Sequence, residues 1–286
     1  MAQRIDIIVN PAGGKGSSRS ALQEAEAYLR AQDVPYTVSG TLAAGDASRI
    51  AADLCAAGSE KIAVIGGDGT FHEVLNGMDF SRARLGFVPA GRGNDYAGAA
   101  GLPLDAADAM RAIIAGVPAD KDFIQVGGRR CLNVCGTGLD VEVLRLAASR
   151  KGRLAYTAAL FRCLLRFRPY TIQVLVNGTL KECACVTAAV CNGSQYGGGI
   201  RVCPPARIDD GMLDLIVVDR PRFMPTLFVM PDFVRGRHMD KPYCTHIRCE
   251  AVKILTPQLI QLDGEIYDEH VLDVRVVPGG LKTYAV

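Results

Sequence analysis

IAVIGGDGTFHE, the stretch from Ile62 to Glu73, decides the fold of the first part of the chain. Its first four residues form a short apolar run typical of a buried strand, and a helical pattern follows. Three glycines within four residues stand between the two. Glycines that end a strand and precede helix amides form an anion site at the edge of an open α/β sheet. The plainer alternative is a tight turn capped by Asp68 or Thr70, but that turn needs fewer glycines.

Two further glycine-rich turns follow other apolar runs. NPAGGKG at residues 10–16 follows Ile5–Val9, and PAGRGND at residues 89–95 follows Leu85–Val88. Helical patterns separate these runs, and alternating strands and helices predict a parallel sheet covered on both faces. We therefore expect an α/β domain in which the three turns converge on one crevice. No GxxxxGK[ST] loop surrounds Lys15 and no GxGxxG follows an expected strand, so two common nucleotide fingerprints are excluded.

The pattern becomes rich in strands after Phe123. Short apolar runs are separated by Gly, Pro and Asp turns, and Asn177-Gly178 is a strong hairpin signal. The expected strands include 131–134, 171–176, 186–191, 213–218, 252–255 and 272–277. One helical stretch, 141–168, interrupts them. We predict an α/β nucleotide-binding domain at 1–123 and a mostly antiparallel β-sandwich with a helical insertion at 124–286, whose last strand returns to the first domain.

Composition and charge narrow the class of protein. The chain has 286 residues, 49% apolar and 22% charged, which excludes disordered and collagen-like proteins. The net charge is +2, but residues 1–123 carry 11 Lys and Arg against 15 Asp and Glu, and the remainder carries 21 against 15. The basic second part predicts an anionic partner, either nucleic acid or a phospholipid surface.

The ten cysteines predict neither a disulfide scaffold nor a local metal motif. The chain is larger than disulfide-stapled domains and contains no CxxC pair, so buried, reduced thiols are favoured over a zinc site. The N-terminus does not resemble a signal peptide, and no long apolar run could span a membrane. We expect a cytoplasmic protein.

Five motifs together resemble the diacylglycerol kinase catalytic family, and the match looks closest to the bacterial lipid kinases. They are Asn10-Pro11 with Gly14, Gly66–Thr70, Gly91-Arg92-Gly93-Asn94-Asp95, Ile208–Asp214 and Leu262–Glu265. The resemblance covers essentially the whole chain. It implies a two-domain fold, ATP as phosphoryl donor, and a lipid hydroxyl as acceptor in a cleft between the domains.

The resemblance also implies which residues bind ATP and Mg²⁺. Asp68 would position the phosphates through Mg²⁺, and Glu73 would lie nearby. Where the family has threonine, this chain has Arg92, whose guanidinium can itself pair with phosphate. The expected nucleotide-binding residues are Asn10, Thr41, Gly66, Gly67, Asp68, Gly69, Thr70, Glu73, Arg92 and Asn94.

Asp263-Gly264 has two interpretations. Apolar residues flank the pair, so a type I′ hairpin turn explains it as well as a catalytic role does. The resemblance favours function. It implies that Asp263 accepts the proton of the lipid hydroxyl and that Glu265 supports the base or a metal.

The turn at Asp209–Gly211 is both good turn chemistry and a group of oxygen ligands. By the same resemblance, a second Mg²⁺ would bind the carboxylate of Asp210 and the carbonyl groups of Arg207 and Met212. Such an ion could stabilise the loop without taking part in the reaction.

Residues 139–170 concentrate positive charge, with seven Lys and Arg against Asp140 and Glu142. Apolar residues at helical spacing within them suit an amphipathic helix on an anionic membrane. The alternative is a helix whose apolar stripe packs on the β domain. Since no nucleic-acid module appears in the sequence, we expect no nucleic-acid partner. We expect instead a lipid substrate in an anionic membrane surface and peripheral association of the protein with that membrane.

The leading hypothesis is an ATP-dependent lipid kinase of the diacylglycerol kinase type. An NAD-kinase-like phosphotransferase is an alternative, disfavoured by the missing Asn-Glu motif of that family. A non-catalytic, nucleotide-gated lipid-binding regulator is a third, motivated by Arg92. The sequence fixes neither the lipid nor the oligomeric state, for which a homodimer is one option.

Overall fold

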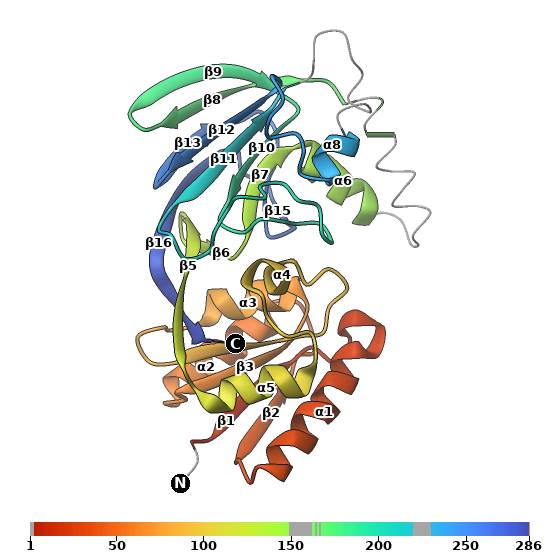
Figure 1. Ribbon diagram of the computed structural model, residues 1–286, viewed down its shortest axis with the longest axis vertical. Coiled ribbons are helices and arrows are strands. Elements are labelled where there is room, and N and C mark those ends of the chain that lie inside the picture. The colour runs from red at the N-terminus through yellow and green to blue at the C-terminus, as the bar shows by residue number, and fades with distance from the viewer. Residues whose placement is uncertain (1–2, 149–161, 164, 166, 220–229, 286) are drawn as a thin grey trace. The chain divides into compact units, whose positions relative to one another are not determined.

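The computed structural model describes residues 3–148, 162–163, 165, 167–219 and 230–285 (Figure 1). The chain divides into two compact units, Met1–Phe123 with Val277–Val286, and Ile124–Val276. It leaves unit 1 within β5 (Pro118–Val126) and returns within β16 (Val271–Tyr284).

Unit 1 is built on a parallel sheet with the strand order β2-β1-β3-β4. The strands are β1 (Ile5–Val9), β2 (Tyr36–Gly40), β3 (Lys61–Gly66) and β4 (Arg84–Pro89). The helices are the 3₁₀ turn η1 (Gly13–Gly16), α1 (Ser17–Ala31), α2 (Asp46–Ala56), α3 (Asp68–Gly77), α4 (Asp95–Ala100) and α5 (Ala106–Ala115). The parallel sheet predicted from the alternating pattern is confirmed.

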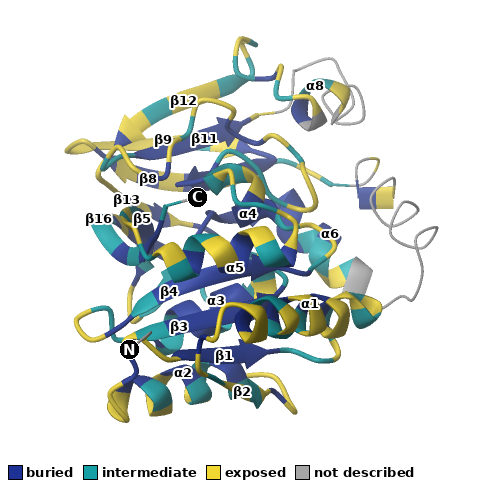
Figure 2. Ribbon diagram, turned by 60° about the horizontal axis from the view of Figure 1, so that its bottom comes forward, coloured by how far each residue is buried: buried dark blue, intermediate teal, exposed yellow. Residues whose placement is uncertain are grey.

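Helices cover both faces of this sheet, which explains why β1, β3 and β4 are apolar and buried (Figure 2). Helix α1 places Ala21, Ala25 and Leu29 on one face at helical spacing, and they join a buried cluster with residues of β1 and α5. Helices α2 and α3 pack against each other so closely that a Cβ on Gly77 would lie 2.0 Å from the carbonyl oxygen of Ser48. Burying a side chain such as Leu29 stabilises the fold by about 2 kcal/mol.

The C-terminal end of β16 belongs to unit 1. The Thr283 hydroxyl donates to the carbonyl oxygen of Leu85 at 2.6 Å, and Arg84 donates to the carbonyl oxygen of Thr283 at 3.1 Å. These bonds tie the last residues of the chain to β4.

Unit 2 is a sandwich of two antiparallel six-stranded sheets, ordered β12-β11-β10-β7-β14-β15 and β6-β5-β16-β13-β8-β9. Its further strands are β6 (Arg129–Cys131), β7 (Val134–Gly138), β8 (Tyr170–Val176), β9 (Thr179–Cys185), β10 (Thr187–Cys191), β11 (Leu213–Val218), β12 (Cys244–Cys249), β13 (Ala251–Leu255), β14 (Ile260–Leu262) and β15 (Glu265–Tyr267). Its described residues also form the helices α6 (Leu139–Ala148) and α8 (Met230–Val234). One buried cluster draws Val174, Leu215, Ile254 and Leu262 from both sheets, so the predicted sandwich is confirmed.

Two local predictions had different outcomes. Asn177 and Gly178 have φ of 49° and 73° and join β8 to β9, as the hairpin signal predicted. The single strand expected at Cys131–Val134 is wrong, because β6 ends at Cys131 and β7 begins at Val134. The amides between them turn aside to bind the carboxylate of Asp263.

Candidate functional site

The glycine-rich turns of unit 1 follow three neighbouring parallel strands. Parallel strands place their carboxyl ends at one edge of the sheet, so the turns after β1, β3 and β4 share that edge. The chain continues from β1 to β2 on one side and then crosses to β3 on the other. Ligands of open α/β sheets bind at such a reversal of strand order.

Glycine is required where the turns after β3 and β4 touch. A Cβ on Gly67 would lie 2.9 Å from the Cα of Gly91, and a Cβ on Gly91 would lie 2.5 Å from the Cα of Gly67. The amide of Ala90 donates to the carbonyl oxygen of Gly66 at 2.7 Å. Backbone therefore packs on backbone, and close packing explains these glycines in addition to any ligand.

The turn after β1 joins the same cluster. The Ser17 hydroxyl donates to the carbonyl oxygen of Ala90 at 2.6 Å, and a Cβ on Gly14 would lie 2.4 Å from that oxygen. The Asn10 side chain donates to the Thr70 hydroxyl at 3.4 Å. Hydrogen bonds thus tie the first turn to the turns after β3 and β4.

Thr41 and Glu73 occupy supporting positions. The Thr41 amide donates to the carbonyl oxygen of Val9 at 2.9 Å, which extends the pairing of β2 with β1, and the residue is buried. The Glu73 carboxylate accepts from the Ala47 amide at 3.2 Å in the first turn of α2. Glu73 therefore anchors α2, a role that the sequence did not indicate.

Asp68 and Asn94 hold the turn after β4 in place. Asp68 accepts from the amide of Tyr96 at 3.1 Å, and Asn94, with φ of 51°, accepts from the amide of Gly91 at 2.8 Å. Arg92 belongs to the same turn, directly after Gly91, and is exposed. Its side chain is therefore accessible at the surface of this turn.

Sequence reasoning missed Lys15 as a site residue. It is exposed in the turn after β1 and has a positive φ of 60°, which is uncommon for a residue with a long side chain. Its cation lies on the same edge of the sheet as Arg92. The positive φ of Lys15 cannot be read from the sequence.

These residues fit a nucleotide and its Mg²⁺. The first turn of α3 starts at Asp68 after the extended Gly67, and amides at a helix N-terminus bind anions. Lys15 and Arg92 add cations, and the half-buried carboxylate of Asp68 is a hard oxygen ligand of the type that Mg²⁺ prefers.

In unit 2, Asp263 and Gly264 form the turn between β14 and β15. Their φ values of 48° and 92° are those of a type I′ turn, so the structural interpretation of this pair holds. The Asp263 carboxylate also binds backbone amides outside the turn. It accepts from the amides of Leu132 at 2.7 Å, Asn133 at 2.8 Å and Val134 at 3.3 Å.

A second set of bonds supports this segment. Asn192 is buried. Its side-chain nitrogen donates to the carbonyl oxygen of Leu132 at 2.7 Å, and its backbone N–H donates to the carbonyl oxygen of Asn133 at 2.8 Å. Sequence reasoning missed Asn192, because its partners lie about sixty positions away. Glu265 is exposed at the start of β15, two residues from Asp263.

Asp140 is a buried residue in the first turn of α6, and its carboxyl group is hydrogen-bonded to the β14-β15 hairpin. The Gln261 side chain accepts from the Gly264 amide at 2.9 Å and donates to Asp140 at 3.1 Å. Burial raises the pKa of Asp140 to about 6, although the hydrogen bond from Gln261 acts in the opposite direction. The Asp263 turn is thereby connected to the first turn of α6.

The predicted second Mg²⁺ site does not fit the contacts around Asp210. One carboxylate oxygen accepts from the Met212 amide at 3.1 Å, and the other pairs with the guanidinium of Arg248 at 2.5 Å. The side chain of Arg207 pairs with Asp209 at 3.4 Å. A cation at Asp210 would have to displace Arg248, so these contacts do not favour a metal ion at this position.

In the basic stretch 139–170, which suggested a membrane helix, residues 149–161, 164 and 166 lie outside the described residues. Of its basic residues, Arg145, Arg162 and Arg168 are described, and all three are exposed. Leu165 is 56% exposed. No helix in the described ranges is long and apolar enough to cross a membrane.

Two family models match successive parts of the chain. Residues 4–126 match the diacylglycerol kinase catalytic domain, and residues 133–285 match the YegS C-terminal NAD kinase beta sandwich-like domain. A diacylglycerol kinase of Bacillus subtilis is 28% identical over 272 residues, covering 92% of this chain and 90% of that protein.

Two further relatives agree with these matches. A Pseudomonas putida protein named "probable lipid kinase YegS-like" is 33% identical over 215 residues, covering 73% of this chain and 72% of that protein. A crystal structure of a diacylglycerol kinase candidate from Bacillus anthracis is 25% identical, with a TM-score of 0.81 over 99% of this chain and 97% of that one.

Proposed function

We propose that this chain, which belongs to the YegS-like family of diacylglycerol and lipid kinases, transfers the γ-phosphoryl group of ATP to the hydroxyl of a diacylglycerol-type lipid. The observation that carries the proposal is the meeting of three glycine-rich turns at the strand reversal of unit 1, where Gly67 lies against Gly91. Phosphate is the ligand that such a cluster of amides suits best.

The proposed nucleotide site uses backbone more than side chains. The turns after β1 and β3 and the start of α3 would bind the phosphates, and Thr70 is held beside Asn10 at their centre. Lys15 and Arg92 would pair with phosphate oxygens. Phosphoryl transfer proceeds through a loose transition state, so positioning and charge neutralisation supply most of the catalysis.

Asp68 is the proposed ligand for Mg²⁺ at this site. When bound, the ion would neutralise charge on the phosphates. The hydrogen bond from the Tyr96 amide fixes one oxygen of the Asp68 carboxylate and with it the orientation of the group.

Asp263 is the proposed general base for the lipid hydroxyl. Three amide donors fix both carboxylate oxygens, so the group is already oriented before substrate binds. Glu265 would assist from the same hairpin. In a loose transition state the base mainly orients the nucleophile, and the nucleophile itself belongs to the lipid.

We further propose that the protein meets its substrate by peripheral association with an anionic membrane. Exposed Arg162, Arg168 and Leu165 support this part of the proposal, since cations and apolar side chains together favour such surfaces.

An assay of label transfer tests the proposed function. The protein is incubated with γ-labelled ATP and Mg²⁺ in mixed micelles that hold one acceptor at a time. The acceptors are diacylglycerol, monoacylglycerol, a sphingoid base and phosphatidylglycerol, with NAD in a parallel reaction. We expect label in diacylglycerol or a related lipid. Label in NAD alone would support the NAD-kinase-like alternative, and ATP binding without any labelled product would support a non-catalytic regulator.

A further inference from the structure

Four side chains capable of binding metal gather on one face of the β10-β11-β12 sheet in unit 2. Asp214 on β11 lies opposite Cys191 on β10, and Ile216 on β11 lies opposite His246 on β12. Since residues two apart on a strand share a face, Cys191, Asp214 and His246 point to the same side of the sheet.

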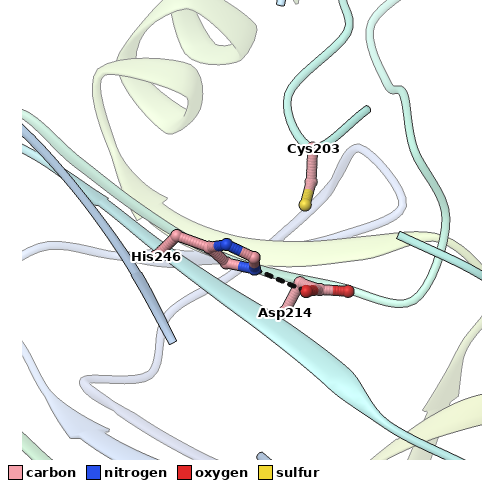
Figure 3. Close-up of side chains that lie close together, drawn as sticks. All are labelled: Cys203, Asp214 and His246. Carbon is pink, nitrogen blue, oxygen red and sulfur yellow. Dashed lines mark hydrogen bonds and ion pairs between the residues drawn. The ribbon is translucent and has the colours of Figure 1, made fainter. Parts of the chain in front are cut away.

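Cys203 approaches this face from the loop between β10 and β11. Its amide donates to the carbonyl oxygen of Ser194 at 3.1 Å, and its own carbonyl accepts from the Ala206 amide at 3.0 Å. These bonds form a compact turn that holds the thiol over the sheet. Figure 3 shows the Cys203 sulfur pointing toward the pair formed by Asp214 and His246.

The ligand atoms of Cys203, Asp214 and His246 all lie within 4.8 Å of one another. The Nε2 atom of His246 lies 2.5 Å from the carboxylate of Asp214, and the Asp214 side chain is only 4% exposed. Ligands of a tetrahedral ion with bonds of about 2.0–2.3 Å lie closer together than this limit, so small rotations would bring all three atoms onto one ion.

Cys191 supplies a fourth candidate ligand. It is fully buried, lies opposite Asp214 in the pairing of β10 with β11, and belongs to the same buried cluster as Cys203. Burial is the main reason that its pKa lies well above the usual value for a thiol. Metal binding by a cysteine releases the proton of its thiol.

The donor set selects the metal. Sulfur, imidazole nitrogen and a single carboxylate suit Zn²⁺, whereas Mg²⁺ prefers oxygen ligands alone. A catalytic cysteine is a poorer interpretation, because Cys203 has no exposed surface and His246 directs Nε2 at Asp214. The guanidinium of Arg248 lies 3.9 Å from Asp214 but pairs more closely, at 2.5 Å, with Asp210.

We propose that Cys203, Asp214 and His246 form a structural Zn²⁺ site in unit 2, with the fourth position open to the neighbouring Cys191 or to water. The ion would tie the loop between β10 and β11 to the sheet. That loop begins at Asn192, whose bonds to Leu132 and Asn133 support the segment that binds Asp263. The proposal does not depend on the kinase activity.

A cobalt titration tests the site on the wild-type chain. Untagged protein is stripped of metal under reducing conditions and titrated with Co²⁺, and Zn²⁺ is then added in competition. We expect one equivalent of Co²⁺ with a thiolate-to-cobalt charge-transfer band and the visible bands of a tetrahedral ion, all abolished by one equivalent of Zn²⁺. Binding should strengthen as pH rises, because the thiols must lose protons. Absence of the charge-transfer band would overturn the proposal.

Substitutions then locate the ion. Cys203→Ser and His246→Gln should each weaken Zn²⁺ binding by at least about tenfold, since each removes one ligand. Cys55→Ser, at a buried cysteine of unit 1, and His270→Gln, at an exposed histidine of unit 2, are matched controls and should bind as wild type. Equal affinity in all four variants would contradict the assignment. If a ligand variant does not fold, the wild-type titration still decides.

Discussion

The glycine-rich turns of unit 1 and the Asp263 hairpin of unit 2 are candidate sites built in opposite ways. In unit 1, Gly67 and Gly91 meet because neither has a side chain, and each turn directly follows its own strand. In unit 2, one carboxylate collects amides from a segment about 130 positions away. The site in unit 1 depends on glycines that leave room for backbone to pack on backbone. The site in unit 2 depends on the single carboxylate of Asp263 and on its hydrogen bonds to residues far away in the sequence.

The largest effect is expected at the single side chain of unit 2. Asp263→Asn should lower turnover by about 10²–10⁴-fold, because the base is lost and an amide nitrogen would face the amide donors. ATP affinity, measured by calorimetry, should stay within about twofold because no proposed nucleotide ligand is changed.

A matched control for that variant is Asn177→Asp, which exchanges amide and carboxylate in the same kind of turn between β8 and β9. It should keep wild-type turnover. Retained turnover in Asp263→Asn would remove Asp263 as the base.

The close contact in unit 1 can be broken by adding one carbon atom. Gly91→Ala places a Cβ 2.5 Å from the Cα of Gly67, which is closer than two such carbon atoms can approach, so the two turns must separate. We expect ATP affinity to fall by about 10- to 100-fold and stability by about 1–3 kcal/mol, as for other overpacked positions. Gly40→Ala is the control, because nothing lies within 4 Å of the added carbon. Equal ATP affinity in both variants would show that the contact does not shape the site.

Unit 2 also contains a buried carboxyl group, that of Asp140, whose charged form lowers the stability of the fold. Because the pKa of Asp140 is about 6 in the folded chain against 3.8 normally, the folded state holds the proton more tightly. The stabilising effect of that proton is complete below about pH 4 and is lost as pH rises through about 6. Asp140→Asn should therefore raise the free energy of unfolding by up to about 3 kcal/mol at pH 8 and change it little at pH 4.

Asp120 in unit 1 provides the opposite case, and urea unfolding at a series of pH values measures the stability of both variants. Partial burial acts to raise its pKa, but hydrogen bonds from Lys282 and Arg84 outweigh this and lower it. Its charged form thus stabilises the fold above the usual pKa and the effect is lost as pH falls, so Asp120→Asn should destabilise unit 1 near neutral pH. Similar pH profiles for the two variants would contradict these pKa directions.

Arg92 gives the smallest expected effect. Arg92→Ala should raise the KM for ATP by about tenfold, the loss of one exposed contact between a cation and phosphate, and leave kcat nearly unchanged. Arg92→Thr should recover part of that loss. Arg111→Ala, at an exposed ion pair with Asp108, is the control. An unchanged KM would show that Arg92 does not contact the nucleotide.

The contrast between the units explains how far the sequence could predict the structure. The turns of unit 1 were predictable because glycine clusters directly follow apolar strands, and parallel pairing then places them at one edge. Asn192, Lys15 and the break at Leu132 were not, since they depend on register, backbone φ and distant hydrogen bonds. The cluster of Cys203, Asp214 and His246 was hidden for the same reason, because no CxxC spacing marks it.

One measurement tests the central claim most directly. Excess wild-type protein is mixed with γ-labelled ATP and Mg²⁺ in diacylglycerol micelles for a single turnover, and the label in lipid, inorganic phosphate and remaining ATP is quantified. The proposed function predicts that the label appears in a phosphorylated lipid with wild-type protein and stays in bound ATP with Asp263→Asn. Label that remains in ATP, or that passes only to water, with wild-type protein would contradict it.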